Sequence, residues 1–267
     1  MICLTCDIHH TSLQTGNQLA CPITEAEVAN RFAGLLEQAG VKATFFVTGK
    51  CFEEEWPEVI KFCANPLISI QGHNYNCFTP PLLHRVWKKL TGNYNGPACI
   101  ENRDIQRTVE IIAEKTGKRI TCWRNHMYMH GPNTDKLLLK HGIKLCSDGV
   151  DISYSKPLIK PSGIYHFPLN IIPDHEHIYH AERTPEWVAW WQKRYNWSDD
   201  FGSESYPIEQ WTELVLEGLR KNEAAGKISN MIIHPITMYL SDQFASFKKI
   251  LSYLAAKECV HLADLAP

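Results

Sequence analysis

Four short stretches, far apart in the chain, carry residue types that together suit metal-assisted hydrolysis. They are Asp7-Ile8-His9, His73 to Cys77, Trp123-Arg124-Asn125-His126 and Ile233-His234-Pro235. Each comes at the end of a stretch that has the composition of a β-strand. Because α/β folds collect their catalytic groups at the C-terminal ends of strands, we expect the four stretches to meet at one site.

The first two stretches offer ligands for a divalent ion. His9 lies two residues after Asp7, so both side chains point to the same side of an extended strand. His73 and Cys77 have the i, i+4 spacing that places two side chains on one face of a helical turn. Since zinc accepts both imidazole and thiolate, we expect His9, His73 and Cys77 to bind it. The alternative for Cys77 is a small buried side chain in the core.

Three residues are candidates for proton transfer and its control. Asp7 follows a buried strand and is the expected base, and Arg124 is expected to pair with a carboxylate and aim it. His234 ends the most apolar strand of the chain and is the expected proton donor. A structural salt bridge is the alternative for Arg124, and a hydrogen-bonded core histidine is the alternative for His234.

Two further groups of residues allow more than one interpretation. Asp174-His175-Glu176-His177 follows Pro173 in an expected loop, either as additional metal ligands or as a wall of the substrate site. Trp187, Trp190 and Trp191 have helical spacing. Packing onto the core is favoured for them over a platform on which sugar rings stack.

Strands and helices alternate along the whole chain. Strands are expected at residues 1–8, 41–48, 67–71, 120–123, 143–146, 163–171, 227–234 and 260–262. Helices are expected at residues 24–39, 53–63, 100–115, 133–140, 184–195, 208–222 and 241–256, with Thr24 as an N-cap. The long loop 74–97 is expected to be functional. The alternation predicts a parallel sheet with outer helices, closed or nearly closed into a barrel of about seven strands.

Composition limits the classes of partner. The chain of 267 residues has 44% hydrophobic residues and a formal net charge of −2, which suits one domain over residues 1–267 and gives no argument for nucleic acid. No segment has the roughly eighteen uninterrupted apolar residues of a membrane span. The ten cysteines are scattered and suit free thiols, so a cytoplasmic location is expected.

The four stretches resemble motifs of the polysaccharide deacetylase superfamily, of the carbohydrate esterase family-four type. In that family Asp7 matches the base, and His9 stands where relatives have a ligating Asp. Gly72-His73 to Cys77 resembles a His-x-x-x-His pair with Cys77 as the second member. Trp123-Arg124-Asn125-His126 keeps the arginine of the third motif and lacks its proline. Ile233-His234-Pro235 resembles the last motif, whose histidine is the general acid.

The resemblance implies a distorted (β/α) barrel and a metal-dependent hydrolase that removes N-acetyl groups from an acetamido sugar or a polysaccharide precursor. The softer ligand set favours zinc over magnesium or calcium and also admits the loss of the metal. Two alternatives remain: an allantoinase-like amidohydrolase acting on a small cyclic amide, and a catalytically silent carbohydrate-binding module. The expected substrate contacts are Tyr75, Asn125, His126, Asp148, Asp174, His175 and His177.

Overall fold

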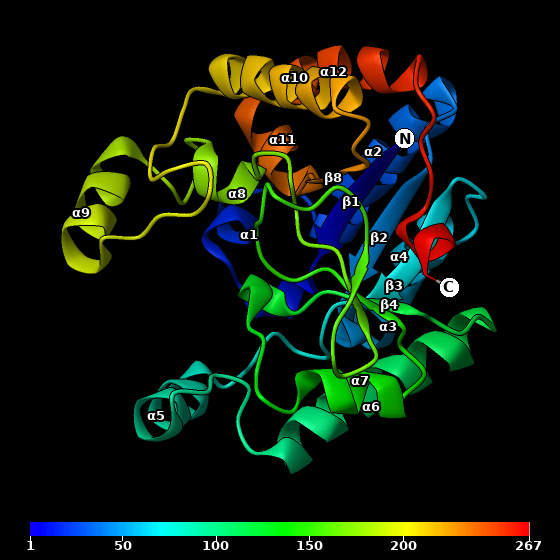
Figure 1. Ribbon diagram of the computed structural model, residues 1–267, viewed down its shortest axis with the longest axis vertical. Coiled ribbons are helices and arrows are strands. Elements are labelled where there is room, and N and C mark those ends of the chain that lie inside the picture. The colour runs from blue at the N-terminus through cyan, green and yellow to red at the C-terminus, as the bar shows by residue number, and fades with distance from the viewer. Residues whose placement is uncertain (267) are drawn as a thin grey trace.

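A single curled sheet runs through the computed structural model, which describes residues 1–266. Within these residues it has eight strands in the order β6-β7-β5-β4-β3-β2-β1-β8, and every neighbouring pair is parallel except β6 and β7. The sheet therefore forms a half-barrel that contains seven mutually parallel strands (Figure 1). The strands are β1 (Ile2–Ile8), β2 (Ala43–Val47), β3 (Ile68–Gly72), β4 (Cys122–Trp123), β5 (Leu145–Cys146), β6 (Leu158–Ile159), β7 (Tyr165–His166) and β8 (Ser229–Ile232).

Helices cover the outer face of the sheet (Figure 1). The four-turn helix α2 begins at the Thr24 cap, whose side chain and that of Glu27 form a reciprocal capping box. The helices are α1 (Gly16–Ala20), α2 (Glu25–Ala39), α3 (Gly49–Glu54), α4 (Trp56–Cys63), α5 (Pro81–Thr91), α6 (Ala98–Thr116), α7 (Thr134–Lys140), α8 (Asp174–His177), α9 (Pro185–Tyr195), α10 (Ile208–Ala224), α11 (Pro235–Asp242) and α12 (Ala245–Ala255).

The two faces of the sheet carry separate apolar clusters. The larger cluster packs the outer face against the helices, and it includes Leu4, Phe45 and Cys146. The smaller cluster fills the inside of the curl with residues of opposite parity, among them Cys3 and Phe46. Because side chains alternate along a strand, Asp7 shares the inner face with Cys3. The inner face of β1 thus changes from apolar to ionisable at its C-terminal end.

Three sequence-based expectations differ from the structure. The loop 74–97 contains α5, an amphipathic helix with little burial. The expected final strand at 260–262 is wrong, because Cys259 makes only a single bridge to Ile2 before a 3-10 turn begins. Packing of the tryptophan helix onto the core is also wrong. Helix α9 projects from the body, and Val188 is its only buried residue (Figure 1).

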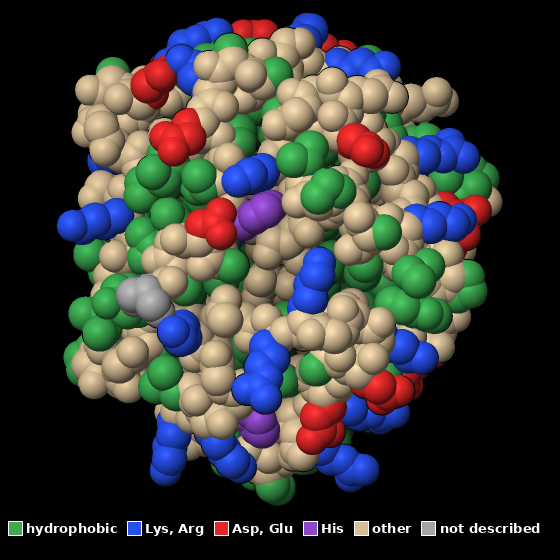
Figure 2. Space-filling model, turned by 90° about the vertical axis from the view of Figure 1, so that its right-hand side faces the viewer, with side chains coloured by type: hydrophobic (Ala, Val, Ile, Leu, Met, Phe, Trp, Pro, Cys, Tyr) green, Lys and Arg blue, Asp and Glu red, His purple; other side chains and the backbone are tan. Residues whose placement is uncertain are grey.

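The surface has no single dominant charge on the face drawn in Figure 2, where Lys and Arg side chains are scattered and Asp and Glu lie between them. Among the described residues, no helix combines the length and apolar character needed to cross a membrane.

Candidate active site

A buried ion pair lies at the mouth of the half-barrel. The carboxylate of Asp7, at the end of β1, accepts a hydrogen bond of 2.9 Å from Nη1 of Arg124, just after β4. Arg124 is fully buried and also donates to the carbonyl and the hydroxyl of Ser147. Burial raises the pKa of Asp7, but the charges of His73, Arg124, His234 and His9 outweigh it and lower the pKa to about 2. Asp7 is therefore ionised at neutral pH.

Two imidazoles beside Asp7 face each other through their Nε2 atoms. His9 directs Nδ1 to Glu25 Oε1 at 2.9 Å, and His73 directs Nδ1 to the carbonyl of Arg124 at 2.9 Å. Because an ionised carboxylate and a carbonyl can only accept, both Nδ1 atoms carry the proton. In the neutral rings both Nε2 atoms are then lone-pair donors, and they lie 3.2 Å apart. Such a contact is repulsive unless a cation or a proton lies between the two nitrogens.

Two more possible ligands complete this group. Donor atoms of His9, His73, Cys77 and His126 all lie within 4.8 Å of one another, and we call these residues the central group. Burial lowers the pKa of His73 to about 4 and that of His126 well below its ordinary value, so both rings are neutral at pH 7. Burial raises the pKa of the Cys77 thiol, so this ligand becomes a thiolate only when a cation stabilises it.

A second carboxylate–imidazole pair faces the central group. Asp174, at the start of α8, accepts the backbone N–H of His234 at 2.6 Å and its ring Nδ1 at 2.7 Å. Burial lowers the pKa of His234, but the charge and hydrogen bond of Asp174 outweigh it and raise the pKa to about 9. Asp7 and His234 line the same cavity of about 300 Å³, so it holds one ionised base and one protonated acid.

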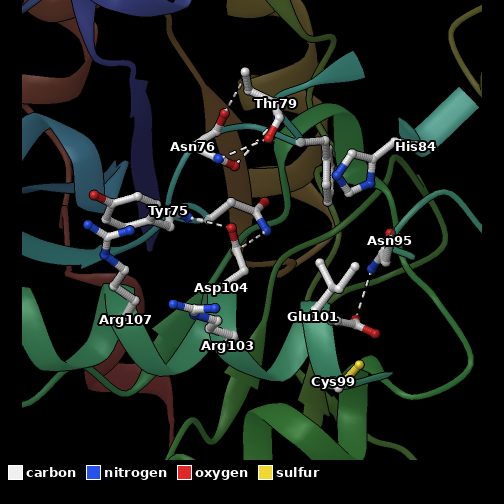
Figure 3. A pocket seen from close by; sticks show the side chains of 13 residues that line it. Tyr75, Asn76, Thr79, His84, Asn95, Cys99, Glu101, Arg103, Asp104 and Arg107 are labelled. Atoms are coloured by element: carbon white, nitrogen blue, oxygen red, sulfur yellow. Dashed lines mark hydrogen bonds between the residues drawn. The ribbon is translucent and has the colours of Figure 1, made fainter. Parts of the chain in front are cut away.

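The loop after β3 is held in place from behind by helix α6. The Asn74 side chain accepts the backbone N–H of His126 at 2.7 Å and donates to Asp104 at 2.9 Å. Asp104 also accepts the backbone N–H of Tyr75. Asn74, Tyr75 and Asp104 line a cavity of about 490 Å³ that is distinct from the catalytic cavity (Figure 3). Asn74 thus fixes the loop of His73 relative to that of His126.

Only some of the expected substrate contacts line the catalytic cavity. His126 and His175 line the catalytic cavity, whereas Asp174 supports His234. His126 also belongs to the central group of possible metal ligands. Its only sequence signal for this role was that it lies two residues after Arg124. Tyr75 instead faces the larger cavity, where its hydroxyl bonds to Glu53 and Arg107 stacks on its ring (Figure 3).

The three other expected contacts, like Tyr75 and Asp174, lie outside the lining of the catalytic cavity. The side chains of Asn125 and Asp148 bond to each other at 2.7 Å, which fixes the loop after Arg124. His177 points away and contacts Asp199 and the carbonyl of Glu204. Within the one-turn helix α8, the two middle residues, His175 and Glu176, line the catalytic cavity, whereas the two end residues do not.

Two further carboxylates lie at the site, and of these the sequence singled out only Glu176, as part of the stretch 174–177. Glu25, the first residue of α2, is buried and orients His9, and its only sequence signal was its place after the Thr24 cap. Glu176 lines the catalytic cavity, and its buried Oε2 atom has no hydrogen-bond partner among the described residues. Burial raises the pKa of Glu176. Its unpaired oxygen is available to a bound molecule.

Comparison with known families gives one match. The family model described as polysaccharide deacetylase matches residues 19–146. That range includes His73, Cys77 and Arg124, whereas Asp7, His9 and His234 lie outside it and take their places from the geometry described above. A comparison with curated protein sequences finds no match.

Solved structures resemble the whole chain. A Mycobacterium smegmatis protein assigned as a polysaccharide deacetylase has 15% identity and a TM-score of 0.71, covering 99% of this chain and 88% of its own. The Puue allantoinase has 13% identity and a TM-score of 0.66, with 99% and 89% covered. The family 4 carbohydrate esterase of Streptomyces lividans, in complex with acetate, has 14% identity and a TM-score of 0.52, with 97% and 90% covered. These likenesses establish the fold as that of the deacetylase half-barrel.

Proposed function

We propose that the chain, whose residues 19–146 match the polysaccharide deacetylase family model, is a deacetylase-like hydrolase of carbon–nitrogen bonds. It would remove N-acetyl groups from an acetamido sugar or polysaccharide precursor with the help of a bound metal. The cavity of about 300 Å³ has room for one sugar unit and its acetamido group. Asp7 and His234 line this space together with two members of the central group, His9 and His126.

The observation that carries the metal proposal is the contact between His9 and His73. Two zinc–nitrogen bonds of about 2.0–2.1 Å at a tetrahedral angle place the nitrogens roughly 3.3 Å apart. The Nε2 atoms of His9 and His73 lie 3.2 Å apart with their lone pairs facing. Glu25 behind His9 is the kind of carboxylate partner that orients metal-ligating histidines. His9, His73 and His126 would hold the ion, with Cys77 as the fourth ligand.

The proposed chemistry divides between the metal and two side chains. A bound divalent ion supplies Lewis acidity, which polarises the acetamide carbonyl and makes water a stronger acid. Asp7 takes a proton from the attacking water while Arg124 keeps the carboxylate ionised and aimed. A carboxylate whose pKa is about 2 is a weak base, so the Lewis acid is needed.

The leaving amine is protonated by His234. Its Nδ1 is bonded to Asp174, so its other ring nitrogen carries the proton that faces the cavity. The pKa of about 9 keeps this ring charged at neutral pH until the carbon–nitrogen bond breaks. Asp174 then stabilises the conformation of the ring for reprotonation from solvent.

The test is release of acetate from N-acetylglucosamine and its short β-linked oligomers, measured with protein freed of metal and then reloaded with zinc, cobalt or nickel. We expect acetate only after metal is added. The variant His73→Ala should lose the ion of the central group and the activity, and His141→Ala, a half-buried histidine outside the central group, should lose neither. No acetate from any of these sugars with any of the metals would refute the N-acetyl sugar as substrate.

The same experiment separates the remaining alternative enzyme. An allantoinase-like activity, favoured by the structural likeness to the Puue allantoinase, predicts hydrolysis of small cyclic amides by the metal-free protein. Hydrolysis of allantoin in the presence of a chelator, together with unchanged activity in His73→Ala, would replace the metal-dependent proposal.

Two broader predictions belong with this proposal. We propose that residues 1–267 form one catalytic domain, supported by a sheet whose strands come from residues 2 to 232. The cytoplasmic location expected from the scattered cysteines stays a prediction.

A further inference from the structure

A second group of metal-ligating side chains lies on the opposite face of the sheet from Asp7. Cys146 ends β5 and packs in the outer core, and His166 ends β7. His130 comes from the loop after the 3-10 turn at His126–Tyr128, and Asp135 from the first turn of α7. Asp148 follows β5 by two residues. We call these five residues the outer group: His130, Asp135, Cys146, Asp148 and His166.

The outer group is connected by contacts at hydrogen-bond distance. The Oδ1 atom of Asp135 lies 3.0 Å from Nε2 of His130 and 2.9 Å from Nε2 of His166. The Oδ2 atom of Asp148 lies 2.8 Å from Nδ1 of His130 and 3.2 Å from Sγ of Cys146. Donor atoms of His130, Cys146 and His166 all lie within 4.8 Å of one another. Five potential ligands from four segments thus converge.

We propose that the outer group is a zinc site, formed by His130, Cys146 and His166 with Asp135 as the fourth ligand. Two imidazoles, one thiolate and one carboxylate are donors that zinc accepts in a four-coordinate site. Asp135 is the fitting carboxylate because it already contacts both imidazoles and is bound otherwise only by the Ser162 hydroxyl. Both carboxylate oxygens of Asp148 already accept hydrogen bonds from Asn125. Asp148 therefore orients His130 through Nδ1 and is not one of the four ligands.

The charge and exposure of the outer group suit an incoming cation. Two carboxylates surround His130, and within residues 1–266 the ion pairs of both are with histidines alone. The side chains of His130 and Asp135 are 28% and 23% exposed, which leaves a path from solvent. The buried Cys146 thiol contacts the Asp148 carboxylate at 3.2 Å and lies 4.0 Å from Nδ1 of His130. A network of hydrogen bonds without metal is the competing explanation.

Zinc at this place would brace a wall of the catalytic cavity. His130 belongs to the same loop as Met127 and Tyr128, which line that cavity and have left-handed φ values of 53°. A metal bond from His130 to strands β5 and β7 would attach this loop to the sheet. The ion is therefore structural, and it is distinct from the one proposed for the central group.

The test is zinc content per chain, measured by elemental analysis after the full-length protein has been dialysed against zinc and then against buffer without chelator. We expect two zinc ions in the wild type and one in each of the variants His166→Ala and Asp135→Asn. The Asp135 side chain is 23% exposed, so its substitution leaves the core intact. His73→Ala should also retain one, and His141→Ala should retain two.

Cobalt provides a second, independent readout of the thiolate. In the His73→Ala background, cobalt bound at the outer group should give the intense near-ultraviolet band of cobalt–thiolate charge transfer, and the added change Cys146→Ser should remove it. If His166→Ala and Asp135→Asn both contain as much zinc as the wild type, the proposal is overturned in favour of the hydrogen-bonded network. Neither result depends on whether the enzyme releases acetate.

Discussion

The central group and the outer group use the same side chain in opposite protonation states. His9 and His73 each have an acceptor on Nδ1 alone, so their Nε2 atoms carry lone pairs. His130 has a carboxylate on each of its two ring nitrogens. Burial lowers the pKa of His130, but the hydrogen bonds to Asp135 and Asp148 outweigh it and raise the pKa to about 10. His130 therefore keeps its proton through two carboxylate hydrogen bonds, whereas His73, bonded through Nδ1 to a carbonyl, is neutral at pH 7.

This difference has a consequence for metal binding in the two places. A cation that binds the central group displaces no proton from His73, whose pKa of about 4 leaves it neutral. A cation that binds the outer group must displace the protons shared with Asp135 and Asp148. We therefore expect zinc to leave the outer group first as the pH falls.

The largest effect is expected from Asp7→Asn, which removes the proposed base from beside the central group. Loss of a general base lowers the rate by about 10²–10⁴-fold. Because His9, His73 and His126 are unchanged, bound zinc should remain. Acetate release and metal content measured on one preparation check both statements. The exposed Asp200→Asn is the matched control, and loss of metal in Asp7→Asn would show that Asp7 is a ligand instead.

The sequence located the centre of this site because three of its signals are local. Asp7 ends a buried strand, His73 follows another, and Arg124 leaves a third, so strand polarity alone brings them together. Parity along the first strand also predicted that Asp7 and His9 point to the same side. The expected pairing of Arg124 with a carboxylate is present in the structure.

The parts that the sequence did not reveal depend on backbone direction in loops. Asn74, directly before Tyr75, has a left-handed φ of 56°, so the chain changes direction after His73 and Tyr75 faces the larger cavity. Glu25 reaches His9 only because helix α2 begins beside β1. The outer group joins residues up to 36 positions apart through short strands, and no spacing rule connects them.

The second prediction concerns the pH dependence of activity. His234 must be protonated to act as an acid, and its pKa is raised to about 9, so activity should fall as the pH rises through about 9. Asp174→Asn removes the charge that raises this pKa and leaves burial, which lowers it. The alkaline limb of kcat should therefore move to lower pH.

A pH profile of kcat on the reloaded enzyme measures this shift. The matched control is Asp199→Asn, which alters the similar pair between Asp199 and His177 at 3.1 Å outside the catalytic cavity and should leave the profile unchanged. An alkaline limb that does not move in Asp174→Asn would exclude His234 as the titrating acid.

The third prediction tests the protonated state of the outer group in the metal-free protein. The folded pKa of His130, about 10, lies above the ordinary value of 6.5. The stabilisation from its charged form is therefore complete below about pH 6.5 and is lost as the pH rises through about 10. Urea unfolding at several pH values should show the difference between wild type and His130→Gln shrinking toward pH 10. A constant difference would mean that the ring is neutral throughout. Added zinc should restore the wild type at high pH.

The smallest effect is expected from Tyr75→Phe, which tests whether the larger cavity belongs to the substrate site. The Tyr75 hydroxyl bonds to Glu53 on the far side of the loop, and one such hydrogen bond contributes about 1 kcal/mol to stability. The substitution should lower the free energy of unfolding by about that amount and leave KM unchanged. Tyr128→Phe, in the wall of the catalytic cavity, is the contrasting variant and should raise KM without a comparable loss of stability. If Tyr75→Phe raises KM several-fold instead, substrate extends past Asn74 into the larger cavity, and the loop that separates the cavities belongs to the substrate site.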